Sequence, residues 1–317
     1  MNAKIINAAS IDGKIAWNDV IQALHDGHKR PRAEIKDIII GAMDHSFLNR
    51  AAWIDGLGGG IKSVTVFPNN PSKNPDLPTV QGVFLLFDEG TGALKAIIDG
   101  PLITHWKTAA DSVLGARLLA RKGAARVLII GAGALAASLV EAYGDGLPQL
   151  ENIGVWGRQT EKAERVAKNS GRANVRAIDG DLEDAVRKSD IIVTATSSPT
   201  PVLLGEWVGR GTHVDLVGAF RSDMREADDA LMRKGRIFVD SYETTIAHIG
   251  ELAIPIASGV ILPSDVLGDL YALVAGLEGR RTDDDITIFK NGGGAHLDVM
   301  TAALCVNVFE SICSLND

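Results

Sequence analysis

The most specific chemical motif in this 317-residue sequence is a glycine-rich turn that follows an apolar run at residues 127–130. The turn has the G-x-G-x-x-G/A pattern, in which Gly131 would make the tight bend and Gly133 would let a pyrophosphate approach the backbone. Ala134 and Leu135 would then begin a helix whose N–H groups and dipole face the phosphates. This context favours a dinucleotide site, although glycine-rich turns also occur without nucleotides.

The residues after the second apolar run, 153–156, indicate which dinucleotide is preferred. NAD enzymes usually carry an acidic side chain at this point for the ribose 2′-hydroxyl, whereas NADP requires a cation. Here Gly157, Arg158, Gln159 and Thr160 follow the run, and none of them is acidic. Arg158 can pair with a 2′-phosphate and Thr160 can hydrogen-bond it. We therefore expect NADP(H), with NAD(H) as the alternative cofactor and a solvated loop arginine as the competing interpretation.

A cluster of small hydroxyl residues, 194–198, follows the fourth apolar run. The carboxyl end of a parallel strand is where the ligand crevice of an open α/β sheet lies, which makes Thr196 a candidate cofactor contact. Polar loop residues without a ligand role fit the same pattern equally well.

Three cations in the first third of the chain are candidates for binding an anionic substrate: Arg32, Lys62 and Lys107. Each of the two lysines interrupts a segment that otherwise has a buried pattern. A buried ammonium group needs an anion, either from the protein or from a substrate carboxylate. Solvated lysines with buried stems are the competing interpretation. His105 and His296 could reach a cleft, although a structural role fits each histidine taken alone. No Ser/His/Asp order, CxxC pair or HExxH motif supports a hydrolase or a metalloenzyme.

The elements that must position the glycine turn begin at Arg126, where strands and helices start to alternate. Strands are expected at 127–130, 153–156, 175–178, 191–196, 214–217 and 237–239, with helices at 134–143, 161–168 and 182–188. Fully apolar strands separated by helices are typical of a parallel sheet covered on both faces. The sequence therefore predicts an α/β, doubly wound Rossmann domain over residues 115–294.

The first third of the chain is expected to have mixed structure. Strands are predicted at 36–40, 64–67, 83–87 and 93–98, a turn at 88–92, a loop at 68–78 and a helix at 108–122. The segment His296–Ile312 has the pattern of a helix with one apolar face, which we expect to pack on the N-terminal part. This organisation predicts a discontinuous α+β domain formed by residues 1–114 and 295–317.

Composition restricts the classes of partner. The chain has 46% hydrophobic and 23% charged residues, and its net charge of −8 provides no basic footprint for nucleic acid or an anionic membrane. The apolar stretch 127–140 is shorter than the roughly 20 residues that span a bilayer. The N-terminus lacks the apolar segment of a signal peptide, and two cysteines cannot form a disulfide framework. We expect a cytoplasmic protein with a small-molecule substrate.

Together these motifs resemble the ornithine cyclodeaminase/mu-crystallin family over nearly the whole chain. The matching stretches are Pro31-Arg32, Gly60–Val64, Leu77–Thr79, Leu102–Thr104, Lys107–Ala110, Gly131–Gly133, Gly205–Val208, Val217–Ala219, Arg225-Glu226, Ile286–Phe289 and Asp298. The resemblance implies a homodimer. An N-terminal α+β domain, completed by the C-terminal helix, would bind the substrate and form the dimer, and a Rossmann domain would hold NAD(H) or NADP(H).

The resemblance also implies roles for individual residues. Arg32 and Lys62, together with Lys107, would hold a substrate carboxylate, and Lys62 would be a candidate proton donor. The resemblance adds five residues expected to touch the cofactor: Thr79, Thr108, Val217, Gly218 and His296. They join the residues of the glycine turn and those after the second and fourth apolar runs.

Two positions depart from the family pattern. Most members have Arg-Thr-Ala-Ala where this chain has Lys107-Thr-Ala-Ala, so a point charge replaces a bidentate fork. A different carboxylate geometry or an altered substrate is the expected consequence. The cyclodeaminase and alanine dehydrogenase branches carry an aspartate where this chain has Phe220, unless Asp223 or Glu226 takes its place. This departure resembles the ketimine-reducing branch and argues against ornithine deamination.

The resemblance thus implies an enzyme, an NAD(P)H-dependent reductase of α-imino (ketimine) carboxylates such as Δ1-pyrroline-2-carboxylate, with an α-amino acid as product. Three alternatives stay open. They are an ornithine cyclodeaminase, an open-chain amino- or imino-acid dehydrogenase of the alanine dehydrogenase or iminosuccinate reductase type, and a non-catalytic NADPH-binding protein like a crystallin.

Overall fold

The computed structural model of the chain describes residues 3–42, 44–74 and 77–314. The chain divides into two compact units, which we call unit 1 (Met1–Thr108 and Gly294–Asp317) and unit 2 (Ala109–Gly293). The predicted boundary after residue 114 lies a few residues beyond this division, inside helix α3 (Gly100–Leu119).

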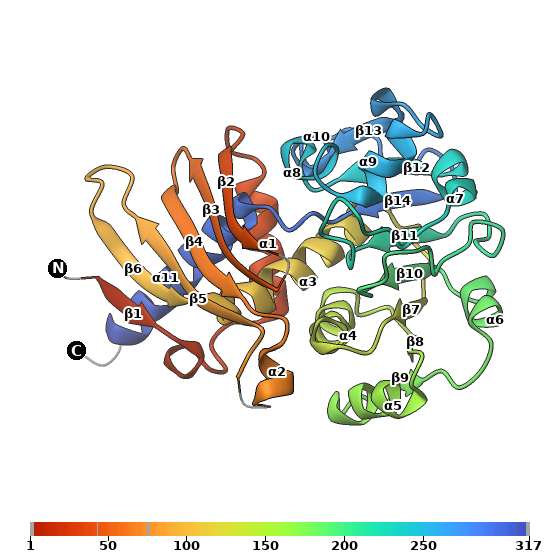
Figure 1. Cartoon of the computed structure of the whole chain (residues 1–317), viewed down its shortest axis with the longest axis horizontal. Helices are drawn as coiled ribbons and strands as arrows, with labels where there is room; N and C mark the ends of the chain where they lie inside the picture. Colours follow the sequence, from red (N-terminus) through yellow and green to blue (C-terminus); the bar gives the residue numbers. More distant parts are fainter. Residues whose placement is uncertain (1–2, 43, 75–76, 315–317) are drawn as a thin grey trace. The chain divides into compact units, whose positions relative to one another are not determined.

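Unit 1 is built on a six-stranded sheet in the order β1-β6-β5-β4-β3-β2 (Figure 1). The strands are β1 (Lys4–Ile6), β2 (Glu34–Ala42), β3 (His45–Ile54), β4 (Gly58–Val66), β5 (Val80–Phe87) and β6 (Leu94–Asp99). β1 pairs with β6 in parallel, and the other neighbours are antiparallel. The predicted strands correspond to β2, β4, β5 and β6. β3 was missed because polar residues such as Asn49 and Arg50 interrupt its apolar pattern.

The helices of unit 1 include the C-terminal helix predicted to pack on the N-terminal part. They are α1 (Trp17–Gly27), the short α2 (Asn70–Lys73) inside the predicted loop, the first part of α3, and α11 (Ala295–Ser314), with a 3₁₀ turn η1 at Ala8–Ser10. α11 lies against strands β1 to β5 and against α1. Its length and hydropathy would also suit a membrane span, but its first two turns are buried in this core.

The predicted helix at 108–122 is wrong at its start, because α3 begins at Gly100. Pro101 stands in the first turn, where proline costs no hydrogen bond and its fixed φ suits a helix. Lys107 therefore lies within a continuous helix, one full turn or more from its end.

Unit 2 contains an eight-stranded, fully parallel sheet in the order β13-β12-β14-β11-β10-β7-β8-β9. Its strands are β7 (Arg126–Ile130), β8 (Asn152–Trp156), β9 (Val175–Ala177), β10 (Ile191–Thr194), β11 (His213–Leu216), β12 (Arg236–Val239), β13 (Val266–Asp269) and β14 (Thr287–Lys290). Its helices are α4 (Ala134–Gly146), α5 (Thr160–Asn169), α6 (Leu182–Arg187), α7 (Asp229–Lys234), α8 (Tyr242–Thr245), α9 (Gly250–Ala257) and α10 (Leu270–Val274), with η2 at Pro263–Asp265.

This sheet confirms the predicted Rossmann fold. The chain runs from β7 outward through β8 to β9 and then returns to the other side of β7 to form β10 and β11. In doubly wound sheets the ligand crevice lies at the carboxyl ends of the strands where the order reverses, which here are β7 and β10. The predicted strands correspond to β7 through β12, whereas β13 and β14 were not predicted from apolar runs.

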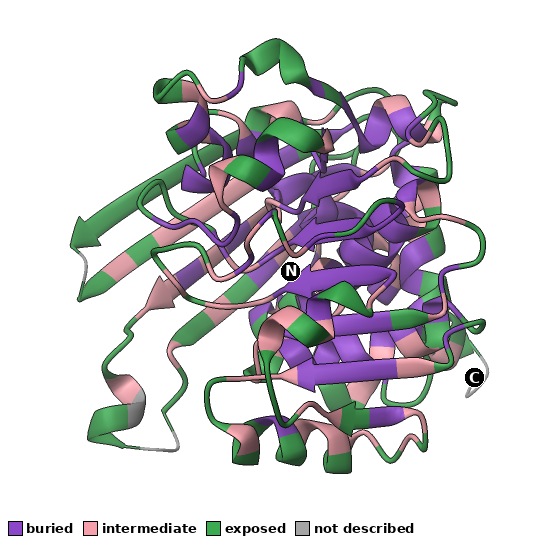
Figure 2. Ribbon diagram, turned by 90° about the vertical axis from the view of Figure 1, so that its right-hand side faces the viewer, coloured by how far each residue is buried: buried purple, intermediate pink, exposed green. Residues whose placement is uncertain are grey.

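The two sheets differ in how far they are buried. In Figure 2 the central strands of unit 2 are buried, whereas β2 of unit 1 is exposed along almost its whole length. Ile38, Ile39 and Ile40 on this edge strand are 58%, 71% and 60% exposed. Three consecutive isoleucines place apolar side chains on both faces of an open sheet edge, which is an arrangement that soluble monomers avoid.

Candidate functional site

Unit 1 contains a buried ion cluster formed by Lys62 on β4, Lys107 on α3 and Asp298 on α11. The Nζ atoms of Lys62 and Lys107 lie 3.2 and 2.9 Å from the same oxygen, Asp298 Oδ1. The three side chains are 8%, 3% and 0% exposed, respectively. The structure thus brings together the two lysines that the sequence singled out, and a protein carboxylate provides the anion that their burial requires.

The cluster has more positive than negative charge. Arg50 on β3 pairs in register with Lys62, so both side chains lie on one face of the sheet. Arg50 itself forms an ion pair with the partly exposed Asp37. The second oxygen of Asp298, Oδ2, has no hydrogen-bond partner among the described residues. A small molecule with one carboxylate and one N–H donor would complement both the excess cation and this acceptor.

The electrostatics make Lys107 the group of the cluster that titrates near neutrality. Burial lowers the pKa of Lys107 to about 7; Asp298 opposes this shift, and Lys62 and Arg50 add to it. Burial alone would raise the pKa of Asp298, but Lys107 and Lys62 outweigh burial and hold it below its usual value. Asp298 is therefore an anion at neutral pH, whereas Lys107 exchanges its proton there.

Asp298 was matched by the family resemblance, but no role was assigned to it. Arg50 was not singled out at all. Neither residue has a local signal, because each becomes part of the cluster only through strand register or through a helix that returns from the far end of the chain. An acidic residue in the first turn of a largely apolar helix is the single sequence feature that marks Asp298.

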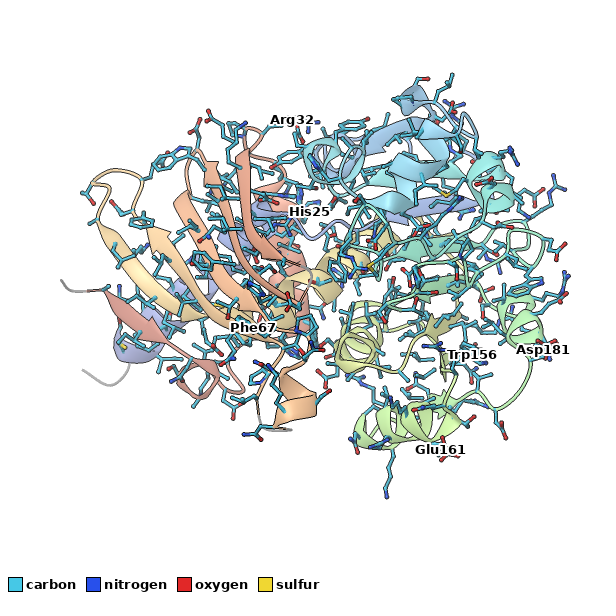
Figure 3. The ribbon with its side chains drawn as sticks, in the orientation of Figure 1. His25, Arg32, Phe67, Trp156, Glu161 and Asp181 are labelled. Carbon is cyan, nitrogen blue, oxygen red and sulfur yellow. The ribbon has the colours of Figure 1, made fainter. Side chains whose placement is uncertain are left out.

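The third predicted cation, Arg32, is exposed and lies two residues before β2 (Figure 3). Its charge nevertheless reaches the buried region. Burial lowers the pKa of His296 well below its usual value, and His28, Lys107, Arg50 and Arg32 contribute to the shift in that order. Arg32 thus adds to the positive potential around the start of α11.

The histidines and threonines of unit 1 lie in different surroundings. His296 is buried edge-on against His28, with ring centroids 5.4 Å apart. His105 is exposed and packs with Trp17 and Trp106 at 5.2 and 5.0 Å. His105 stands two residues before Lys107, so it points about 200° around the helix from it. Thr79 and Thr108 are half-buried, before β5 and immediately after Lys107. Their predicted cofactor contacts, like that of His296, stay predictions.

In unit 2, the glycine turn has the geometry that the motif predicts. Gly131 has φ +134°, and a Cβ at this position would lie 2.4 Å from the carbonyl oxygen of Ala195, so only glycine fits. Its N–H donates to the carbonyl of Trp156 at 2.8 Å. Gly133 is the N-cap of α4, and no atom lies within 4 Å of the position that its Cβ would occupy. This open space beside a helix N-terminus, which Ala134 and Leu135 begin, fits a pyrophosphate group.

The predicted discriminators of the cofactor follow the neighbouring strand. β8 ends at Trp156 (Figure 3). Arg158 follows two residues later and is exposed, and Thr160 is the first residue of α5. Arg158 thus stands beyond the carboxyl end of the strand next to β7, where a ribose substituent would be recognised.

The loops after β10 and β11 contain the remaining predicted contacts, Thr196, Val217 and Gly218. The N–H groups of Val217 and Gly218 donate to the carbonyl of Thr194 at 3.0 and 3.1 Å. The buried carboxylate of Glu226 joins the same two loops, accepting hydrogen bonds from Thr196 and Gly218 among others. This contact was not predicted from the sequence.

The same region shows what stands at the position of the missing aspartate. Phe220 is 64% exposed, and the guanidinium of Arg221 lies 5.7 Å from its ring centroid. Asp223 forms an exposed ion pair with Arg221 at 2.8 Å. Asp223 is thus engaged in an exposed ion pair, and Glu226 is buried in the loop hydrogen bonds.

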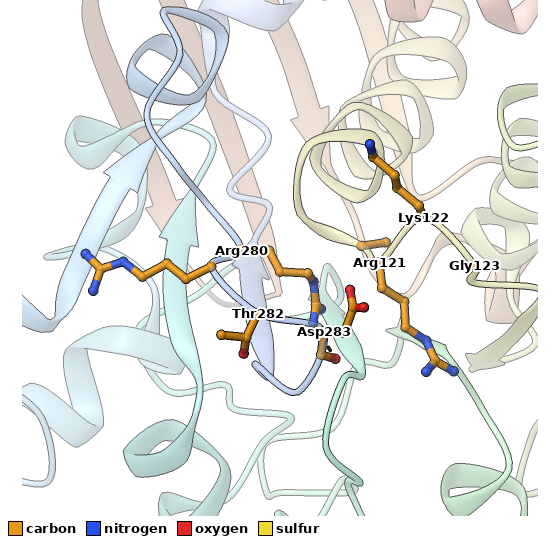
Figure 4. Close-up of a pocket in the computed structure, with 8 residues that line it drawn as sticks. Arg121, Lys122, Gly123, Arg280, Thr282 and Asp283 are labelled. Atoms are coloured by element: carbon orange, nitrogen blue, oxygen red, sulfur yellow. Dashed lines mark hydrogen bonds between the residues drawn. The ribbon is translucent and has the colours of Figure 1, made fainter.

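A surface cavity of about 730 Å³ in unit 2 lies elsewhere (Figure 4). It is lined by residues 120–123 and 280–283, which precede β7 and β14. The cavity therefore opens at the amino ends of the strands, whereas ligands of doubly wound sheets bind at the carboxyl ends. Its central arginine, Arg280, donates to backbone carbonyls such as that of Leu119 at 2.8 Å, which is a structural role.

Comparison with known proteins points to one group. The model of the ornithine cyclodeaminase/mu-crystallin family matches residues 54–314. A Delta(1)-pyrroline-2-carboxylate reductase of Paracoccus denitrificans (strain Pd 1222) is 52% identical over 299 residues, which cover 93% of this chain and 94% of the relative.

Two solved structures share the whole fold. The Thermococcus litoralis Delta(1)-pyrroline-2-carboxylate reductase, in complex with NADH and L-proline, has a TM-score of 0.89 at 29% identity and covers 98% of both chains. An archaeal alanine dehydrogenase dimer with bound NAD has a TM-score of 0.90 at 28% identity, covering 100% of this chain and 98% of the other.

Proposed function

Because this chain belongs to the ornithine cyclodeaminase/mu-crystallin family, we propose that it is an NAD(P)H-dependent reductase of α-imino carboxylates, with Δ1-pyrroline-2-carboxylate as the first candidate substrate. The observation that carries this proposal is the buried Lys62–Asp298–Lys107 cluster, in a chain 52% identical to a reductase of that imine. A cyclic imino acid presents a carboxylate beside a C=N bond, and the cluster offers cations and one available acceptor.

The side chains of unit 1 have separable roles in the proposed reaction. Lys62, with the surrounding charge of Arg32, binds the substrate carboxylate. Asp298 Oδ1 holds the two ammonium groups, and Oδ2 accepts the N–H of the protonated imine or of the product amine. The bound nicotinamide supplies the hydride that reduces the imine carbon.

Lys107 is our candidate for the group that provides the proton. Reduction of a neutral imine to an amine adds one hydride to carbon and one proton to nitrogen. A donor with a pKa near the working pH transfers protons most effectively, and burial brings the pKa of Lys107 to about 7. The family resemblance favoured Lys62 in this role, and exchange of Lys107 for arginine separates the two candidates.

The cofactor is a nicotinamide dinucleotide, held by the glycine turn of unit 2. The preference for NADP(H) over NAD(H) is part of the proposal and depends on Arg158 and Thr160. Both stand at the carboxyl end of β8, and the connection between β8 and α5 contains no acidic residue for a ribose 2′-hydroxyl. The solved reductase of Thermococcus litoralis holds NADH, so binding of both reduced cofactors is the direct test.

We further propose that the protein is a cytoplasmic homodimer. The exposed isoleucines of β2 support a second copy as the cover for this edge, and the archaeal alanine dehydrogenase relative is a dimer. Sedimentation equilibrium checks the assembly. Ile39→Lys, which puts a charge on the edge, is expected to shift the protein to monomer. Lys14→Glu, at an exposed position outside the sheet, serves as its control.

The function is tested by measuring oxidation of NADPH and NADH with cyclic and open-chain imino acids. We expect turnover of Δ1-pyrroline-2-carboxylate and formation of proline. Ammonia release from L-ornithine would instead identify a cyclodeaminase, and turnover restricted to 2-oxo acids with ammonia would identify an open-chain dehydrogenase. Tight binding of NADPH without turnover of any imine would identify a binding protein.

A further inference from the structure

We propose that Glu226 is a positioning residue for the cofactor: its buried carboxylate holds the loops after β10 and β11 in the shape that receives the nicotinamide half. This inference rests on the proposed function only in naming the cofactor. Glu226 itself is fully buried, so it acts through the loops and not by contact with the substrate.

Five hydrogen bonds converge on this one carboxylate. Oε1 accepts from the backbone N–H and the hydroxyl of Thr196, both at 2.7 Å. Oε2 accepts from the Thr194 hydroxyl at 2.8 Å and from the N–H groups of Gly218 and Ala219 at 2.7 and 3.2 Å. Each oxygen thus serves a different set of donors. Because the five donors belong to both loops, the side chain ties the two loops together as a clamp.

The clamp is located where two adjacent strands would otherwise separate. β10 and β11 are paired in register up to Thr194 and Leu216, beyond which the ladder ends. A Cβ on Gly218 would lie 2.1 Å from the Thr196 carbonyl oxygen and 2.6 Å from Glu226 Oε1. The loops therefore approach so closely that residue 218 must be glycine, and the carboxylate fills the remaining space between their N–H groups.

The backbone of Glu226 is also held by hydrogen bonds on both sides. Its N–H and that of Ala227 donate to the two oxygens of Glu251 on α9, at 2.7 and 2.9 Å. Its carbonyl accepts from the N–H groups of Val202 and Leu203 at 2.8 and 3.0 Å. A residue held at both backbone groups presents its carboxylate in one position, which is what a positioning role requires.

The topology indicates which half of the cofactor depends on this clamp. The glycine turn follows β7 and would hold the pyrophosphate, and β8 lies on the side where the adenosine ribose is recognised. β10 and β11 lie on the other side of β7, so their loops belong to the second nucleotide. Loss of the clamp is therefore expected to weaken binding of the whole dinucleotide while leaving an adenosine-side fragment almost unaffected.

The test compares Glu226→Gln with the wild type in calorimetric titrations of NADPH and of adenosine 2′,5′-bisphosphate, which lacks the whole nicotinamide nucleotide. Glutamine keeps the size but turns one acceptor into a donor that faces N–H or O–H groups. We expect the Kd for NADPH to rise about 10-fold or more, equivalent to about 1.4 kcal/mol. The Kd for the fragment should change less than about 2-fold, and kcat with the imine should fall.

A matched control is Asp190→Asn. Asp190 is also a buried carboxylate that accepts backbone N–H groups, those of Ala125 and Arg126, but at the amino ends of the strands. The Asp190→Asn substitution should lower the melting temperature without changing the Kd for NADPH. Equal losses for NADPH and the fragment in Glu226→Gln, or the same Kd change in Asp190→Asn, would overturn the positioning role in favour of general destabilisation.

If Glu226→Gln does not fold, Thr194→Val replaces it. Thr194 is fully buried, so it does not touch the cofactor, and its hydroxyl donates to Glu226 Oε2. A weaker Kd for NADPH with an unchanged fragment Kd is expected, and an unchanged Kd for both ligands would overturn the inference. Failure of the proposed function looks different: the wild type would bind NADPH and the clamp variants would weaken it, yet no imine would turn over.

Discussion

The buried carboxylates of Asp298 and Glu226 differ in the kind of donor that surrounds them. Asp298 in unit 1 is held by two ammonium groups, one of which titrates near neutrality, and one of its oxygens lacks a partner among the described residues. Glu226 in unit 2 is surrounded by backbone N–H and hydroxyl groups, and both of its oxygens are used. The first arrangement leaves charge and an acceptor for a ligand, whereas the second is complete and can only hold the backbone.

Of the substitutions that test this difference between the two carboxylates, removal of Asp298 is expected to have the largest effect. Asp298→Ala leaves Lys62 and Lys107 buried without their shared anion, and we expect the free energy of unfolding to fall by about 3 kcal/mol. Lys107 can lose its proton and so avoid part of a larger cost. Denaturant unfolding measures the change. As a control, Asp37→Ala breaks the partly exposed Arg50–Asp37 pair and should cost less than about 1 kcal/mol. Equal costs would show that the cluster is not the buried charge centre of unit 1.

The proposed ligand role of the cluster is tested by Lys62→Ala. Removing a cation that binds the substrate carboxylate should lower kcat/KM for Δ1-pyrroline-2-carboxylate by about 10-fold or more, with the Kd for NADPH unchanged. Arg32→Ala is expected to act in the same direction. Steady-state kinetics measure both, and Lys14→Ala, at an exposed lysine outside the sheet, should leave kcat/KM as it is. Unchanged kinetics in both variants would remove the carboxylate-binding role.

The pH dependence of the reaction tests Lys107. Its pKa is lowered to about 7, so it is protonated below pH 7 and neutral above it. If it supplies the proton, kcat/KM for the imine should fall about 10-fold per pH unit above pH 7. Arginine stays protonated throughout this range and does not give up its proton, so Lys107→Arg should lower kcat/KM and abolish the inflection near pH 7. An inflection that persists in Lys107→Arg would assign the titration to another group, with the proton donor to be sought at Lys62.

The same contrast explains how much could be predicted from the sequence. The strands and the glycine turn of unit 2 were predictable, because a buried parallel sheet requires continuous apolar runs and the turn requires glycine at 131. In unit 1, Lys62 and Lys107 were conspicuous because a charge inside an apolar pattern is costly.

The residues that complete both sites were not predictable in this way. Asp298 is 236 positions from Lys62 in the chain, and only the packing of α11 on the sheet brings the two together. Glu226 occupies an ordinary polar stretch, and its importance comes from backbone N–H groups, which every residue carries. Side chains of unusual type can be recognised in a sequence, whereas contacts to the backbone cannot.

The smallest expected effect belongs to Arg158, an exposed charge that contrasts with the buried Lys62. Arg158→Ala removes the cation proposed to pair with the 2′-phosphate, so the Kd for NADPH should rise about 10-fold, while the Kd for NADH should stay within about 2-fold. The Kd change for NADPH in Arg158→Ala should become smaller at higher salt, because water and ions screen an exposed ion pair. The kcat/KM change in Lys62→Ala should show no comparable salt dependence, because Lys62 is buried. Fluorescence titration with both cofactors measures the effect. Equal losses for NADPH and NADH would show that Arg158 does not choose between the two cofactors.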